Sequence, residues 1–156
     1  MGGISVLFLM GILSTIFLFF VFIFISMVFV YIIGYLFEGL TVSSYLTEKR
    51  YQAWIPFYNK YLLGNITGEH QLGIVSAICS VPGIIMGYVL FMIGELNYVL
   101  FVIFLLILII GFIVDHIIAY HYISQRSRYA NVLIVISVLT LGILRPIILF
   151  ILKDRK

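Results

Sequence analysis

The first 37 residues of the chain contain no charged side chain. A helix of about 20 apolar residues is long enough to cross the roughly 30 Å hydrocarbon core of a bilayer, and three more long apolar runs follow before Lys156. Hydrophobic residues make up 64% of the chain and charged residues 10%. A soluble domain of this length could not bury that much apolar surface. The sequence therefore predicts an all-α, polytopic membrane protein.

We expect one transmembrane domain, residues 1–156, with four helices. The first run carries phenylalanines on every face of a helix, which is typical of a span that contacts lipid on most sides. The second and third runs are joined by a very short connection that contains Glu95, so they should form an antiparallel hairpin. The approximate spans are 8–37, 72–93, 98–118 and 132–152.

The polar segment after the first span is rich in aromatic residues and does not resemble a free linker. Tyr51, Trp54 and Tyr58 are spaced as one face of a helix, but Pro56 forbids an uninterrupted helix through them. Tryptophan and tyrosine prefer the headgroup layer of a membrane. We therefore predict a broken, amphipathic interfacial segment over residues 44–63. Trp54 should be buried at the headgroup level, and Asn59 should hydrogen-bond to backbone that the proline leaves unpaired.

Small residues recur at helical spacing in the second run. A stripe of this kind lets two backbones approach closely, which is how helices associate in lipid. We expect the stripe to pack against another span of the same chain, and a subunit interface is the alternative. The predicted contact residues are Ser76, Ser80, Gly83 and Gly87.

Asp115 and Arg145 are the acid and the base that fall inside apolar runs. An ionisable group at membrane depth suggests a function, but Asp115 could equally be a hydrogen-bonded structural acid near the end of its span. At about 1.5 Å per residue, the two residues differ in depth by about 15 Å. One side chain cannot bridge that gap, so we expect Arg145 to extend toward the C-terminal face and meet Glu95.

The distribution of basic residues gives an orientation. With four crossings, the two longer loops share one side of the membrane and hold five Lys or Arg residues, against three in the C-terminal tail. The positive-inside rule then places both loops in the cytoplasm and both termini outside. The five loop residues are Lys49, Arg50, Lys60, Arg126 and Arg128.

The sequence predicts no catalytic, metal or cofactor site. Asp115, His116 and His121 could suggest a metal, but on one helix they point in different directions. No nucleophile–base pair or phosphate-binding glycine loop is evident, and no basic stripe suggests nucleic acid. We therefore expect no enzyme activity, no cofactor and no nucleic-acid partner.

The string Trp54-Ile55-Pro56-Phe57-Tyr58-Asn59 resembles the W-x-P-x-Y-N motif of an uncharacterised bacterial family of small multi-span membrane proteins. That family is a domain of unknown function, and it is also found fused to some type I signal peptidases. The resemblance continues to Asp115 and to the segment 144–150 around Arg145. It implies a multi-pass protein of the bacterial cell membrane, and it implies no activity.

Three functional classes remain. We rank first a non-catalytic scaffold, accessory or immunity-type subunit that binds the bilayer and a membrane-protein partner or a second copy of itself. The second class is an oligomeric transporter or pore for a lipid or small solute, although a polar stripe along a span is missing from the sequence. The third class is an intramembrane enzyme.

Overall fold

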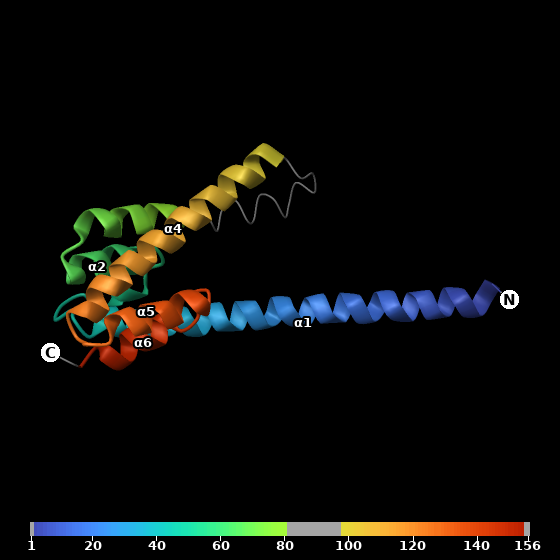
Figure 1. Ribbon diagram of the computed structural model, residues 1–156, viewed down its shortest axis with the longest axis horizontal. Coiled ribbons are helices and arrows are strands. Elements are labelled where there is room, and N and C mark those ends of the chain that lie inside the picture. Colours follow the sequence, from blue (N-terminus) through green and yellow to red (C-terminus); the bar gives the residue numbers. More distant parts are fainter. Residues whose placement is uncertain (1, 81–97, 155–156) are drawn as a thin grey trace. The chain divides into compact units, whose positions relative to one another are not determined.

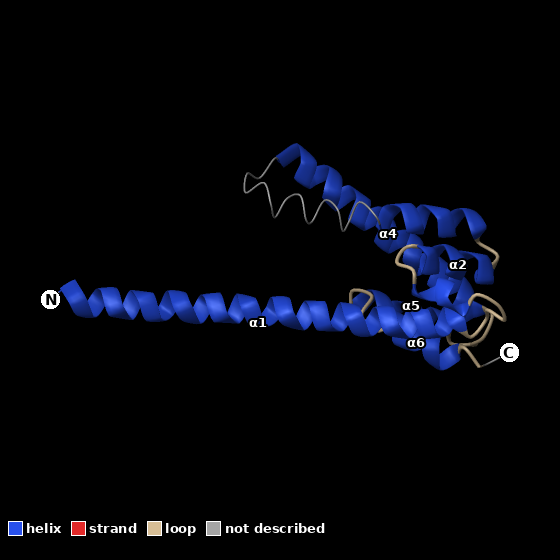
Figure 2. Ribbon diagram, turned by 180° about the vertical axis from the view of Figure 1, so that it is seen from behind, coloured by secondary structure: helices blue, strands red, loops and turns tan. Residues whose placement is uncertain are grey.

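The computed structural model describes residues 2–80 and 98–154, and every regular element in these two ranges is helical (Figure 2). The chain divides into two compact units, Met1–Ile33 and Gly34–Lys156. The all-α prediction is therefore confirmed for the described residues. Residues 81–97 carry Gly83, Gly87 and Glu95, so the predictions that concern these three residues lie outside the described part of the chain.

Helix α1 runs from Gly2 to Ser43 and contributes to both units. It contains no proline, and most of its side chains are aliphatic or aromatic. Its main polar groups are therefore the backbone N–H and C=O groups, which a helix satisfies internally, as lipid requires. None of its most apolar 18-residue stretch is buried, and Tyr98–Ser124 is a second long apolar helix. The structure thus contains two helices that are long and apolar enough to cross a membrane.

The segment after α1 is broken in two around Pro56. The 3₁₀-helix η1 covers Arg50–Trp54, and helix α2 covers Tyr58–Thr67. Between them, Phe57 has a φ of 71°, and the backbone N–H of Asn59 donates to the carbonyl of Ile55 at 3.2 Å. The proline therefore ends one short helix, and a backbone hydrogen bond helps to start the next.

Helix α2 and the helical residues 70–80 meet at two glycines. A methyl group on Gly64 would lie 2.4 Å from the Cα of Gly73 and 2.9 Å from the carbonyl oxygen of Glu69. A side chain at this position would therefore collide with backbone, which cannot move aside as a flexible side chain can. Glycine is required here because the two backbones almost touch.

Helix α4 covers Tyr98–Ser124, so it continues six residues beyond the predicted end of the third span. The predicted fourth span, 132–152, is two helices in the structure: α5 covers Ala130–Leu139 and α6 covers Arg145–Leu152. The break has a physical cause. Leu141 and Gly142 both have positive φ, and the N–H of Gly142 donates to the carbonyl of Ser137 at 2.8 Å, which is a Schellman helix end.

Helices α5 and α6 lie side by side and antiparallel (Figure 1). Tyr129 and Leu133 at the beginning of α5 line the same hollow as Ile148 and Leu152 in the later part of α6. The end of α6 also lies near the end of α4, because Tyr45 donates to the carbonyl of Lys153 and is hydrogen-bonded to Tyr122. The chain therefore returns to the level at which α4 ended.

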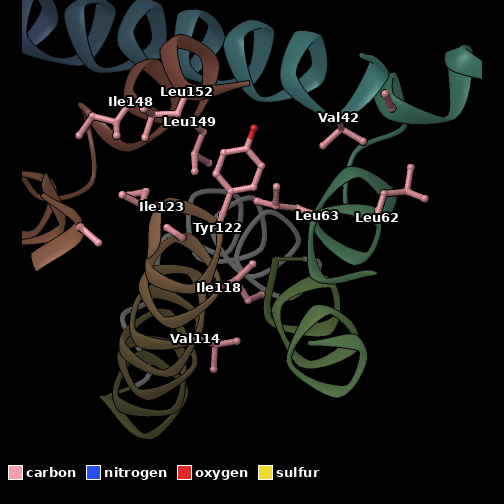
Figure 3. Packing of buried hydrophobic residues seen from close by; sticks show 13 residues of the cluster. Val42, Leu62, Leu63, Val114, Ile118, Tyr122, Ile123, Ile148, Leu149 and Leu152 are labelled. Carbon is pink, nitrogen blue, oxygen red and sulfur yellow. The ribbon is translucent and has the colours of Figure 1, made fainter. Parts of the chain in front are cut away.

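The core of the second unit forms where these helices converge. Tyr122 of α4, with no exposed surface, lies among side chains of α1, α2 and α6 (Figure 3). Its hydroxyl is hydrogen-bonded to Tyr45, and the guanidinium of Arg126 lies 3.8 Å from its ring centre. The other labelled core residues are Val42, Leu62, Leu63, Val114, Ile118, Ile123, Ile148, Leu149 and Leu152.

The glycine contact gives a stability prediction. Gly64→Ala should lower the free energy of unfolding by about 2 kcal/mol or more, because the added methyl group must push two backbones apart. Gly11→Ala is the matched control, since nothing lies within 4 Å of that position. Denaturant titration in detergent, followed by circular dichroism, measures both variants. Equal stabilities would contradict the close contact.

The α5–α6 hairpin gives a topology prediction. In a Cys79→Ala background, single cysteines at Thr47, Ser127 and Asp154 should all react with a membrane-impermeant maleimide from the same side of the membrane. A continuous fourth helix would instead place Asp154 opposite the other two. Labelling of Asp154→Cys from the opposite side would therefore overturn the hairpin.

Candidate functional site

Four charged side chains meet in a closed ring inside the second unit. The Lys60 ammonium lies 3.0 Å from Glu38 Oε1 and 2.8 Å from Asp115 Oδ2. The Arg145 guanidinium contacts the same two atoms, at 2.9 Å from Glu38 Oε1 and 2.5 Å from Asp115 Oδ2. Each base therefore binds both acids. We call Glu38, Lys60, Asp115 and Arg145 the charge ring.

Each member of the charge ring comes from a different helix. Glu38 lies near the end of α1, Lys60 in the first turn of α2 and Asp115 within α4. Arg145 is the first residue of α6, where the Schellman turn before it and Pro146 after it fix the helix start. A fifth segment joins through Ser76, which donates a hydrogen bond to Asp115 Oδ1.

The charge ring is shielded from its surroundings. The exposed fractions of the side chains are 4% for Glu38, 10% for Arg145, 15% for Lys60 and 17% for Asp115. A single charge buried in this way would carry a large desolvation cost. The ring contains two acids and two bases, so its net charge is zero and each charge has partners of opposite sign.

The depth of the ring follows from the helices. Asp115 lies nine residues before the end of α4, which corresponds to roughly 13 Å along the helix axis. Arg145 lies seven residues before the end of α6, or roughly 10 Å. Since these two ends lie near each other, the two residues reach a similar level.

A second polar contact ties α4 to the α5–α6 hairpin. His116, one residue after Asp115, lies 3.1 Å from the hydroxyl of Ser137 through Nε2, and its Nδ1 lies 2.8 Å from the carbonyl of Phe112. Ser137 has no exposed surface. A methyl group on Gly142 would lie 3.3 Å from the imidazole. His116 therefore packs directly under the turn that positions Arg145.

The structure corrects the sequence prediction for Arg145. We expected it to avoid Asp115 and to extend toward the C-terminal face, and the structure pairs it with Asp115 and Glu38. The depth estimate failed because it counted residues along one straight helix. The reversal at Leu141–Gly142 turns the chain back and brings Arg145 to the level of Asp115.

The sequence prediction also missed two members of the charge ring. Glu38 directly follows the predicted first span, 8–37, and carried no prediction of its own, whereas Lys60 was one of the loop charges used for the orientation. A signal was present for the helix break: Gly142 followed by Arg145-Pro146 is the pattern of a helix end and a new helix start. The contacts of Glu38 and Lys60 in the ring could not be predicted without the tertiary fold.

The aromatic segment has a defined structure next to the ring. Trp54 is 39% exposed, and its ring lies 3.0 Å from where a methyl group on Gly39 would be. Its carbonyl accepts a hydrogen bond from Tyr35. Pro56 is exposed, and the ring of Tyr58 lies 5.4 Å from that of Tyr61. The segment is therefore held against α1.

The prediction for Asn59 is wrong in its partner. Asn59 is 1% exposed, but its amide nitrogen has no hydrogen-bond partner within the described residues. Its backbone N–H, and not its side chain, donates to the carbonyl of Ile55 next to the proline. Asn59 therefore occupies the core face of α2 with an unsatisfied donor, which is costly.

The small-residue face packs within the chain over its described part. Ser76 is 1% exposed and contacts Asp115, while Ser80 donates to the carbonyl of Ser76 at 2.8 Å. On the same helical segment, the Cβ of Cys79 lies 3.2 Å from where a methyl group on Gly111 of α4 would be. These contacts join residues 70–80 to α4. Gly83 and Gly87 lie outside the described residues.

The contacts of the charge ring are those of a group that holds helices together. Both bases contact both acids, and Ser76 donates a hydrogen bond to the second oxygen of Asp115. Among residues 2–80 and 98–154, no three His, Cys, Asp or Glu side chains come together as metal ligands. One donor is left over, since Arg145 Nε is buried without a partner in that same part of the chain.

The comparisons with known proteins give no relative. No protein-family model matches the chain, and neither the curated proteins nor the solved structures contain a match.

Ring closure can be tested by a double-mutant cycle. Arg145→Met and Asp115→Asn should each lower the free energy of unfolding by about 3–5 kcal/mol, because each leaves a buried charge unpaired. The double variant restores neutrality, so it should lose at least about 1 kcal/mol less than the sum of the two single changes. Denaturant titration in detergent measures all four proteins.

The control for this cycle is the Glu69–His121 pair, with a 3.0 Å contact and side chains that are 38% and 37% exposed. Its coupling, measured with Glu69→Gln and His121→Gln, should stay below about 1 kcal/mol. Strict additivity at Asp115 and Arg145 would show that the ring does not act as a unit.

Proposed function

We propose that this chain is a non-catalytic integral membrane protein, an accessory, scaffold or immunity-type subunit that binds a membrane partner through the apolar half of α1. The observation that carries the proposal is the surface of residues Phe8–Ile33. Its large apolar side chains are exposed on every face of the helix, with Phe17, Phe22 and Phe24 at 67%, 68% and 68%. Phenylalanine is among the aromatic residues that are enriched at protein interfaces.

The charge ring supports a scaffold more than an active site. A catalytic acid or base needs a proton that can move and a substrate within reach. Here both acids are held by two bases each, and the ring is largely buried. This arrangement fixes five helical segments against one another, which is what a rigid platform for a partner requires.

The distribution of basic residues supports an orientation. Seven of the nine Lys and Arg residues lie outside the charge ring, and the described ones belong to residues 49–50, 126–128 and 153. Those segments meet around Tyr45, which binds Lys153, Tyr122 and Arg126. The positive-inside rule therefore favours a cytoplasmic location for both loops and for the C-terminal end. This differs from the sequence prediction, which placed the C-terminus outside.

The remaining parts of the proposal come from the sequence. The resemblance in Trp54–Asn59 and around Arg145 supports a multi-pass protein of a bacterial cytoplasmic membrane. In our proposal the chain crosses the membrane three times instead of four, through α1, the predicted second span (72–93) and α4. Residues 81–93 of the second span lie outside the described part of the chain. The α5–α6 hairpin enters and leaves the membrane on one side. This accounts for the short length of α5 and α6, each too short to span a bilayer.

A second candidate, an oligomeric transporter, is favoured by one observation. Discontinuous helices form the binding sites of many transporters, and α6 begins with the buried Arg145 immediately after the broken turn. Arg145 Nε, which has no hydrogen-bond partner among the described residues, is the atom that would meet a solute there.

Photo-crosslinking in cells tests the proposal. A photoreactive phenylalanine analogue at Phe17 or Phe24 should give a discrete crosslinked band, because a partner protein covers this surface. The control position is Leu139 on α5, which is 77% exposed and belongs to the second unit. It should give no protein band.

The mass of the crosslinked band separates the two candidates. A band of about twice the chain mass that contains only this protein would favour the oligomeric transporter. A band with a different protein supports the accessory subunit. Adducts with lipid alone at both α1 positions would contradict the partner role.

A further inference from the structure

Outside the charge ring, the described Asp, Glu, Lys and Arg residues of the second unit lie in the segments that follow α1, α2, α4 and α6. They are Glu48, Lys49, Arg50, Glu69, Arg126, Arg128, Lys153 and Asp154. We call the ends of these four helices, together with the charged segments that follow them, the polar end.

Contacts between the helices place these four ends side by side. The hydroxyl of Tyr45, two residues after α1, lies 2.9 Å from that of Tyr122 and 2.8 Å from the carbonyl of Lys153. Gln125 Nε2 donates to the carbonyl of Thr67 at 3.2 Å, which joins the end of α2 to the end of α4. The polar end is therefore one region of the molecule.

The segment between α1 and α2 leaves the polar end and returns to it. Lys60 in the first turn of α2 lies 2.8 Å from Asp115, and the last residue of α2, Thr67, is at the polar end. Helix α2 therefore begins at the level of the charge ring and runs back to the polar end. Residues 44–57 must cover the same distance in the opposite direction.

The residues just before α2 are held against α1 at that level. The carbonyl of Trp54 accepts a hydrogen bond from Tyr35, and its indole lies 3.0 Å from where a methyl group on Gly39 would be. Tyr35 and Gly39 lie on either side of Glu38, the member of the charge ring on α1. Trp54 is therefore close to the level of the ring, roughly 10–13 Å from the polar end along the helices.

The outer surface at the level of the charge ring is apolar. Ile113 and Ile117, two residues before and after Asp115 on α4, are 51% and 38% exposed. If α4 crosses the membrane, the polar end faces water, and the ring lies well inside a hydrocarbon core whose half-thickness is about 15 Å.

Two hairpins turn at this level with apolar side chains exposed. In the first, Ile55 and Tyr58 beside Pro56 are 44% and 37% exposed. In the second, the α5–α6 hairpin, Leu141 is 80% exposed, and a methyl group on the next residue, Gly142, would lie 3.3 Å from the imidazole of His116 beside the ring.

We propose that residues 44–67 form a re-entrant hairpin that enters the lipid from the same side as the α5–α6 hairpin, with the surface around Ile55 and Pro56 in contact with acyl chains. This rests on the proposed crossing of α4 and not on the partner role of α1. It replaces the position at the headgroups that the sequence predicts for Trp54.

The backbone of this segment is suited to lipid. A non-helical segment at membrane depth must have its polar groups satisfied by the protein. The N–H of Ile55 donates to the carbonyl of Gln52 at 3.2 Å, and the N–H of Asn59 donates to the carbonyl of Ile55 at 3.2 Å. The carbonyl of Trp54 is bound by Tyr35. Acyl chains, unlike water, would also bury the exposed apolar side chains.

Fluorescence quenching of the unmodified chain tests the proposal, because Trp54 is its single tryptophan. The protein is reconstituted in phosphatidylcholine vesicles that carry a nitroxide either on the headgroup or on the middle of an acyl chain. The acyl-chain nitroxide should quench Trp54 more strongly and place it within about 10 Å of the bilayer centre, against about 15 Å or more for a headgroup position.

Three variants in a Trp54→Phe background calibrate the depth. Leu141→Trp in the second turn should give the same depth as Trp54. Tyr129→Trp, 73% exposed at the beginning of α5, should be quenched mainly from the headgroup. Ile113→Trp, eleven residues before the end of α4, should lie near the bilayer centre, since it is roughly 16 Å from the polar end.

The outcomes separate this proposal from the membrane role itself. A deep Ile113→Trp with Trp54 quenched mainly from the headgroup would overturn the re-entrant hairpin and leave the crossing of α4 intact. A deep Ile113→Trp with Trp54 quenched by neither nitroxide would show that protein, not lipid, covers the segment, which also overturns the proposal. An Ile113→Trp that neither nitroxide quenches would overturn the crossing of α4 as well.

Discussion

The architecture of the second unit depends on one electrostatic constraint: a charge inside an apolar environment must meet its opposite. Glu38, Lys60, Asp115 and Arg145 satisfy one another in a closed ring. This constraint fixes the rotation and the depth of each helix, because a helix turned by one residue moves its charge by about 100°. The apolar contacts of the core are less selective, since many side chains can fill the space around Tyr122. We therefore propose that the ring selects the native packing of α1, α2, α4 and α6, the role in specificity that buried polar groups have in some proteins.

The sequence predicted what composition and spacing control. The apolar helix of α1, the helix of residues 98–118 and the interruption at Pro56 all follow from residue type and period, and the structure has them. The prediction failed where a local signal competed with hydrophobicity. Residues 132–152 are apolar enough for one span, but Leu141 and Gly142 take positive φ and end the helix. This single turn brings Arg145 to the depth of Asp115 and reverses the direction of the C-terminal segment.

The sequence could not reveal pairs of residues that lie far apart along the chain. Lys60 is 55 residues from Asp115 and 22 from Glu38. Arg145 is 107 residues from Glu38. Helical periodicity carries no information about such separations. It put Ser76 on a small-residue face, and the contact of Ser76 with Asp115 comes from the fold. Asn59 shows the same limit in reverse. Its proximity to Pro56 suggested a local role, yet the side chain is buried in the core face of α2, and the backbone closes the turn.

The charged residues inside the ring and those outside it have different roles. The ring is neutral and buried, so it contributes to packing and not to the field around the protein. Outside the ring the sequence holds seven bases and four acids, so the excess of positive charge lies there. Had Arg145 and Lys60 stayed at the surface, the buried Glu38 and Asp115 would have remained unpaired in an apolar setting. The pairing of those two bases with those two acids therefore permits carboxylates in the interior.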